Sequence, residues 1–189
     1  MGKVTRFNIE NYCHFVTSKT YRNARIFSNE HAVKLLIQTI FEVKAKLNFL
    51  LIAFVVMPDH MHLMIVPDKR NTISDVMRHI KGRFARRYNL LSRGINSPDY
   101  GIHDHRAGNL SSSYKHDTHR AGNLSLPDSK VWQESFYDHV IRNKMEFVER
   151  LNYIYYNPVK AKLVDKPEDY KYSSATGKYE TDLFCYVGG

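Results

Sequence analysis

Two apolar runs separated by a short polar turn decide the fold: residues 50–66 read LLIAFVVMPDHMHLMIV. The first run ends at Pro58-Asp59, and the second begins with His60. Side chains in a strand alternate between the two faces of a sheet, so His60 and His62 point to one face and Met61 to the other. The segment therefore predicts two adjacent strands with a histidine pair at the start of the second.

A His-x-His pair on one strand face can do two different things. The two imidazoles lie about 7 Å apart along the strand, which is close enough to share one divalent metal ion. They can also be partly buried side chains that only form hydrogen bonds. The pair by itself does not separate the two interpretations, and a second pattern 90 residues later bears on the choice.

The second pattern lies in a predicted helix over 143–157, which is expected to end near Pro158 because the residue before a proline avoids helical backbone. At about 100° per residue, one apolar stripe forms its core face: Phe147, Val148, Leu151, Ile154 and Tyr155. Tyr153 lies nearly opposite this stripe, and Asn157 follows one turn later on the same side. A tyrosine held off the core face beside an amide that can bind metal is typical of a nucleophile that attacks a phosphodiester. The alternative is an exposed tyrosine with no role.

Four spaced motifs carry a resemblance to a known family. They are His60-Met61-His62 after Pro58-Asp59, Trp132-Gln133, Asp138-His139-x-Ile141-Arg142, and Tyr153-Ile154-x-x-Asn157-Pro158-Val159-Lys160-Ala161. In this order they resemble the HUH single-tyrosine transposases, and within these the REP-associated tyrosine transposases. The similarity covers roughly residues 11–174, apart from one insert.

The resemblance implies specific roles for these residues. His60, His62 and Asn157 would hold Mg²⁺ or Mn²⁺, and Tyr153 would be the catalytic residue that attacks DNA. Tyr155 and Tyr156 are close enough that the register of the nucleophile stays open. The implied partner is single-stranded DNA with hairpins. Insertion-sequence relatives act as dimers and the REP-associated branch as monomers, so the oligomeric state, monomer or homodimer, also stays open.

The composition agrees with a nucleic-acid partner. The chain of 189 residues carries a formal net charge of +9 and has a pI near 9.5, which predicts an anionic partner, either nucleic acid or a membrane surface. No run approaches the ~18 apolar residues of a membrane span, and the first residues lack the apolar core of a signal peptide. We therefore expect a cytoplasmic protein without membrane association, in which Cys13 and Cys185 are free thiols.

The order of predicted elements is β-α-β-β-α-β followed by the tyrosine helix. The predicted strands cover 13–19, 47–57 and 60–66, with further strand material at 131–133 and 136–141, and the predicted helices begin at 28–30 and 71–74. This order is that of the split β-α-β, ferredoxin-like plan of the α+β class. We expect one domain with an antiparallel sheet and helices packed on one face.

The second predicted helix, from Thr72 to Arg93, is strongly basic. Solvation alone explains many charged faces, but an excess of one sign indicates phosphate contact. The DNA-binding candidates are Arg78, Lys81, Arg83, Arg86 and Arg87 on this helix, together with Arg142 and Lys160 near the tyrosine helix.

Residues 94–129 differ from the rest of the chain. They are rich in small and polar residues, and the heptamer HRAGNLS occurs at 105–111 and again at 119–125. Two short polar copies cannot form a solenoid, so we predict a flexible loop that was expanded by duplication.

These patterns predict a metal-dependent single-strand DNA transposase that cleaves and rejoins DNA through a 5′-phosphotyrosine intermediate. Three alternatives remain, and one of them is a hydrolytic metal nuclease that would use water rather than tyrosine as its nucleophile. A replication-initiator or relaxase-like HUH endonuclease uses the same histidine pair. A non-catalytic nucleic-acid-binding module would leave both histidines without a role, and the chain lacks the strand signature of the common RNA-binding sheet.

Overall fold

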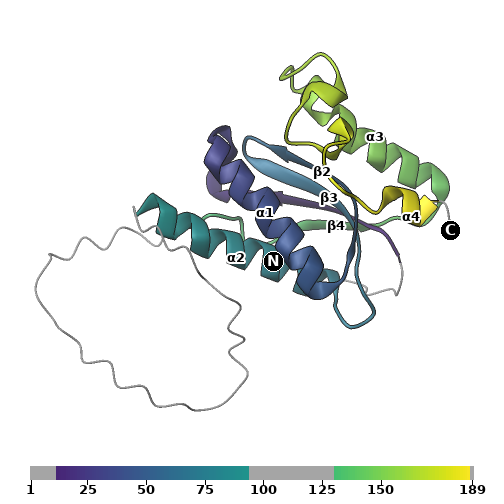
Figure 1. Cartoon of the computed structure of the whole chain (residues 1–189), viewed down its shortest axis with the longest axis horizontal. Helices are drawn as coiled ribbons and strands as arrows, with labels where there is room; N and C mark the ends of the chain where they lie inside the picture. The colour runs from purple at the N-terminus through teal and green to yellow at the C-terminus, as the bar shows by residue number, and fades with distance from the viewer. Residues whose placement is uncertain (1–11, 94–129, 188–189) are drawn as a thin grey trace, which may run out of the picture.

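The structure is a computed structural model that describes residues 12–93 and 130–187 (Figure 1). Four strands form one antiparallel sheet in the order β2-β3-β1-β4. The strands are β1 (His14–Lys19), β2 (Leu50–Met57), β3 (His60–Val66) and β4 (Tyr137–Val140), and the helices are α1 (Glu30–Leu47), α2 (Ile73–Ser92), α3 (Lys144–Lys160) and α4 (Leu183–Val187). The predicted ferredoxin-like α+β plan is confirmed. The predicted repeat loop lies outside the described residues, and the single-domain organisation stays a prediction.

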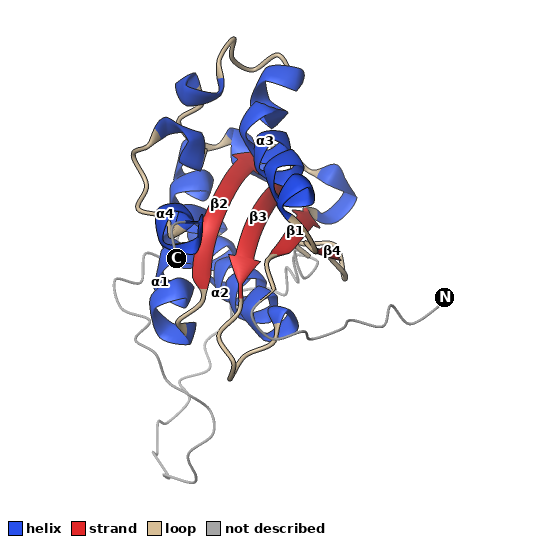
Figure 2. Cartoon of the chain, turned by 90° about the vertical axis from the view of Figure 1, so that its right-hand side faces the viewer, coloured by secondary structure: helices blue, strands red, loops and turns tan. Residues whose placement is uncertain are grey.

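Helices cover both faces of this sheet (Figure 2). Helices α1 and α2 pack on one face, where Leu36, Ile40 and Phe84 join the core. Helix α3 packs on the other face through Phe147 and Ile154. The expectation of helices on one face is right for α1 and α2 and wrong for α3. The central strands are apolar at nearly every position, so both of their faces must be shielded from water.

Side-chain caps set where the helices begin. The Asn29 side chain accepts hydrogen bonds from two backbone N–H groups at the start of α1. Thr72 and Asp75 form a reciprocal capping box at the start of α2, and the Asn143 side chain accepts from the Glu146 N–H at the start of α3. Each cap satisfies N–H groups that the first turn of a helix leaves without partners.

Helix α3 differs from its predicted form in two ways. It continues through Pro158 to Lys160, because a proline in the last turn removes only one backbone hydrogen bond. The Asn157 and Pro158 carbonyls still accept from the N–H groups of Ala161 and Leu163. Val148, expected in the core stripe, is 45% exposed, so the buried stripe is narrower than predicted.

The C-terminal segment covers the outer edge of β2. The Val56 N–H donates to the Tyr172 carbonyl, and the Tyr170 hydroxyl donates to the Val56 carbonyl. The Phe54 N–H donates to Ser174 Oγ. An edge strand left open invites pairing with other chains, so these bonds close that edge.

Both cysteines are free thiols, as predicted. Burial raises the pKa of Cys13 to about 12, so this thiol stays protonated and unreactive at neutral pH. None of the helices in the described ranges has the length and hydrophobicity needed to cross a bilayer.

Candidate active site

The histidine pair lies at the start of β3 on the face that α3 covers. The His60 and His62 ring centroids are 4.8 Å apart, and Met61 between them is buried among the α1 and α2 side chains. The predicted alternation is therefore observed. Cross-strand register places Lys19 and Thr17 of β1 directly beside the two histidines.

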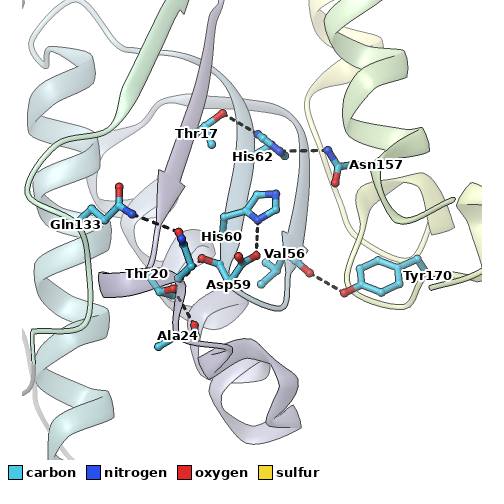
Figure 3. Close-up of polar contacts among 11 residues, drawn as sticks. Thr17, Thr20, Ala24, Val56, Asp59, His60, His62, Gln133, Asn157 and Tyr170 are labelled. Carbon is cyan, nitrogen blue, oxygen red and sulfur yellow. Dashed lines mark hydrogen bonds and ion pairs between the residues drawn. The ribbon is translucent and has the colours of Figure 1, made fainter. Parts of the chain in front are cut away.

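Hydrogen bonds on both ring nitrogens orient the His62 ring. Asn157 Nδ2 on α3 donates to His62 Nε2 across 3.3 Å (Figure 3). Because Nε2 accepts, Nδ1 carries the proton and donates to Thr17 Oγ1 at 2.8 Å. Burial, together with the nearby His60 and Lys19, lowers the pKa of His62 to about 3. At neutral pH His62 is uncharged, which is the form that binds metal.

Asp59 holds the second ring. Its carboxylate Oδ1 accepts from His60 Nδ1 at 2.6 Å, in the turn between β2 and β3. A carboxylate or hydroxyl on one ring nitrogen of a histidine fixes the tautomer and directs the other nitrogen outward. Asp59 and Thr17 therefore prepare both Nε2 atoms for a shared ligand.

These residues fit a divalent metal ion. Two imidazole nitrogens and one amide oxygen form a donor set that suits Mn²⁺ or Mg²⁺ when water or phosphate oxygens complete the shell. If the side-chain amide of Asn157 rotates by half a turn, its oxygen takes the place of its nitrogen beside His62. In the described residues no three His, Cys, Asp or Glu side chains cluster as a metal site, so the amide of Asn157 is needed to complete the set.

Tyr153 lies beside this pair. Its ring centroid is 5.1 Å from that of His62 and 5.6 Å from that of Phe15, both in edge-to-face geometry. The side chain is 37% exposed, so it is reachable from solvent. As predicted, Tyr153 lies outside the buried stripe of α3, which consists of Phe147, Ile154 and Pro158. Its ring nevertheless contacts side chains of β1 and β3.

The two neighbouring tyrosines are placed differently. Tyr155 is half-buried against the α3 face of the sheet, and burial raises its pKa. Tyr156 is 49% exposed and lines a hollow on the outer side of α3 together with Tyr153. Of the three tyrosines, only Tyr153 has a recorded ring contact with the histidine pair.

Two cationic side chains flank Tyr153. Lys160 Nζ is 5.4 Å from the Tyr153 ring centroid. The Arg150 guanidinium carbon is 5.2 Å from the centroid of Phe15, which itself touches both Tyr153 and His62. The sequence prediction included Lys160 and missed Arg150, Thr17 and Phe15.

Comparisons with known proteins agree with this geometry. A family model described as "Transposase IS200 like" matches residues 8–100, a range that contains the histidine pair. The matched range is just under half of the chain, and it is similar to the IS200-like transposase family.

Relatives of this transposase family extend the similarity to α3. A putative REP-associated tyrosine transposase of Haemophilus influenzae is 28% identical over 134 residues, which are 70% of this chain and 62% of that protein. A REP-associated tyrosine transposase of Escherichia coli is 25% identical over 189 residues, covering 96% of this chain and 90% of that protein. This chain thus spans less than two thirds of the Haemophilus protein and most of the Escherichia protein.

A solved structure shares the fold. A REP-associated tyrosine transposase bound to a REP hairpin superposes with a TM-score of 0.66 at 24% identity, over 95% of this chain and 89% of that one. The similarity establishes a common architecture with a transposase-family protein.

The basic helix α2 of this IS200-like chain is not part of the tyrosine site. It packs on the sheet face opposite α3 (Figure 2). Arg83 and Arg87 both pair with Glu42 of α1, at 3.0 and 3.1 Å. Arg78 pairs with Asp75. DNA contact by this helix stays a prediction, and the charges of Arg83 and Arg87 have a structural role between two helices.

Other predicted DNA contacts also have partners within the protein. Lys81 Nζ donates to the carbonyls of Gln133 and Ser135. Arg142 is exposed just before α3, and its backbone N–H donates to Glu146, whose carboxylate also pairs with His139. The structure brings only Lys160 of the predicted DNA contacts into contact with Tyr153.

The buried state of His62 predicts that the stability of this protein depends on pH. His62 has a pKa of about 3 when folded and about 6.5 when unfolded, so below pH 6.5 protons bind the unfolded chain preferentially. Its contribution to stability is complete above pH 6.5 and is lost as the pH falls toward 3. We expect metal-free protein to lose about 2 kcal/mol of unfolding free energy from this group between pH 7.5 and 5.

Urea unfolding in EDTA at several pH values measures this effect. The His62→Gln protein should be less stable at pH 7.5 and should lack this part of the acid destabilisation. Parallel pH profiles in the two proteins would contradict the assignment of a strongly depressed pKa to His62.

Proposed function

We propose that the chain is a metal-dependent single-strand DNA transposase that cleaves and rejoins DNA through Tyr153. The observation that supports this most directly is the meeting of Tyr153 and Asn157 of α3 with His62 of β3. These residues are distant in sequence, and packing alone does not require a histidine, an amide and an exposed tyrosine at one point. Similarity to the IS200-like transposase family over residues 8–100 supports the same chemistry.

The reaction joins the Tyr153 oxygen to the scissile phosphorus and breaks the bond to the 3′ oxygen. The products are a 5′-phosphotyrosine and a free 3′-hydroxyl, which takes up a proton, while the phenol proton passes to solvent. A divalent metal ion held by His60, His62 and Asn157 would polarise the phosphate and neutralise developing charge.

Rejoining is the reverse reaction. The 3′-hydroxyl of the same strand or another strand attacks the phosphotyrosine and releases Tyr153. The phosphodiester energy is conserved in the protein–DNA bond, so no nucleotide cofactor is needed.

We further infer that the DNA partner is a single strand carrying a hairpin. A tyrosine on a helix can reach a phosphate in line with the leaving oxygen only if the backbone bends, and a stacked duplex resists such bending. One relative of the same fold was solved bound to a REP hairpin.

The alternatives differ in what they would produce. A replication initiator or relaxase of the HUH class would form the same adduct but would act on a different DNA site. A hydrolytic metal nuclease would cut without an adduct, and a non-catalytic binding module would do neither. The presence of Tyr153 next to His62 favours the covalent reaction.

A labelling experiment tests the proposal. We expect wild-type protein incubated with Mn²⁺ and end-labelled hairpin strands from the flanks of its gene to form an adduct that survives denaturing electrophoresis. Duplexes of equal length should give much less adduct. Cleavage without any adduct would favour the hydrolytic nuclease over this proposal. If neither cleavage nor an adduct is observed, the non-catalytic binding module would be favoured.

A further inference from the structure

The outer side of α3 carries a hollow next to Tyr153. The proposed cleavage and rejoining of DNA do not by themselves require this hollow. Six side chains line it: Glu149, Arg150, Asn152, Tyr153, Tyr156 and Lys160. The lining combines two aromatic rings, two cations and two side chains with hydrogen-bonding ends. Such a mixture is what a nucleotide requires, since its base is flat and polar at the edge and its phosphate is anionic.

Arg150 gives an independent indication that a ligand belongs here. Its Nε is buried and has no hydrogen-bond partner in the part of the chain that the structure describes. A buried guanidinium nitrogen left without an acceptor costs free energy, and Arg binds phosphate through paired N–H groups. The guanidinium lies against Phe15, which touches Tyr153 and His62, so a phosphate on Arg150 would be close to the nucleophile.

Tyr156 supplies a surface on which a base can stack. It is 49% exposed, so its ring is accessible to a base in solution. It follows Tyr153 by three residues, so the two rings are neighbours along one side of α3. Glu149 and Asn152 bring a carboxylate and an amide to the same hollow, where they can pair with the edge of a stacked base.

We propose that this hollow binds one unpaired nucleotide of the DNA strand next to the scissile phosphate. Tyr156 stacks on the base, and Arg150 and Lys160 contact the backbone phosphate. The bound nucleotide then holds the scissile phosphate over the histidine pair and within reach of Tyr153. The inference rests on the proposed function and adds to it a site that positions the strand.

Abasic substitution of the DNA tests the stacking contact. The probes are hairpin oligonucleotides with an unpaired tail, in which one abasic nucleotide replaces each tail position in turn. Affinity is measured by fluorescence anisotropy in the Tyr153→Phe background, so that no strand is cleaved. We expect one abasic position to weaken binding by about 5- to 100-fold, because stacking of one base on an aromatic ring contributes that much.

Substitution of Tyr156 tests whether this ring makes the stacking contact. In Tyr156→Ala we expect weaker binding of the intact strand by a similar factor and no further loss at the sensitive abasic position. Tyr156→Phe keeps the ring and should restore the wild-type abasic profile. An exposed aromatic residue outside the hollow, Phe184 of α4 at 85% exposure, provides the matched control, and Phe184→Ala should bind as the parent protein does.

Arg150 should behave differently from Tyr156. We expect Arg150→Gln to weaken binding of every strand about tenfold, to keep the sensitive abasic position, and to reduce the magnitude of the salt slope by about 0.7. Arg150→Lys should restore the slope, and thermal unfolding checks that each variant is folded.

Two results would overturn the site: an unchanged affinity in Tyr156→Ala, or an abasic profile that Tyr156→Ala does not alter. If the wild-type protein forms the adduct normally, either result would reject the nucleotide site in the hollow and leave the proposed function standing. Loss of the adduct in wild-type protein would instead reject the proposed function.

Discussion

In the Tyr153→Phe protein we expect no covalent adduct with DNA, while the affinity for the same strand stays nearly unchanged. The substitution keeps the ring that contacts Phe15 and His62 and removes only the oxygen that attacks phosphorus. Because Tyr153 is 37% exposed, loss of its hydroxyl leaves no buried polar group without a partner. The measurements are adduct formation on a denaturing gel with Mn²⁺ and strand affinity by anisotropy.

The neighbouring tyrosines supply the controls for this prediction. Tyr155→Phe and Tyr156→Phe should both form the adduct, since Tyr155 is half-buried among core side chains and Tyr156 points into the outer hollow. An adduct that persists in Tyr153→Phe and disappears in one of the other two would move the nucleophile to that residue.

Removal of either histidine should abolish metal-dependent cleavage. His60→Ala takes away a ring that Asp59 orients, and His62→Ala takes away the ring shared by Thr17 and Asn157. His60 is partly exposed, so its loss should change stability little. His62 is buried, so we expect a cost of about 2 kcal/mol from the space left behind, which leaves the protein folded at room temperature.

Calorimetric titration of Mn²⁺ into each protein without DNA measures the metal site apart from activity. Both alanine variants should lose most of the heat of binding. His139→Ala is the matched control, because His139 lies on the same sheet face but pairs with Glu146. Cleavage that survives EDTA, or Mn²⁺ binding that survives in both variants, would contradict the assignment of the metal ligands.

The strands and their faces could be predicted from local pattern. An alternating or continuous apolar run defines a strand, and the period of two then places His60 and His62 together without knowledge of their neighbours. The same reasoning located α1 and α2 through their caps and apolar spacing. It failed for the end of α3, which continues through Pro158 to Lys160. A proline breaks a helix when it removes a hydrogen bond in the interior, but it costs little in the last turn.

The candidate site could be predicted only in part. Tyr153, Asn157 and the two histidines came from residue type and spacing together with the family resemblance. Thr17, Phe15 and Arg150 carried no recognisable signal, since a threonine, a phenylalanine and an arginine in amphipathic segments are common. Their relevance appears only when the register of β1 against β3 and the position of α3 are known.

Sequence alone determined the class of fold, the shared face of the histidine pair and the position of the tyrosine helix, because these depend on periodicities within a few neighbouring residues. Tertiary structure decided which face each helix covers, that Tyr153 contacts His62, and that Arg83 and Arg87 pair with Glu42. These outcomes depend on contacts between residues far apart in the chain. The role of a charged or aromatic side chain depends on which partner the packing places beside it.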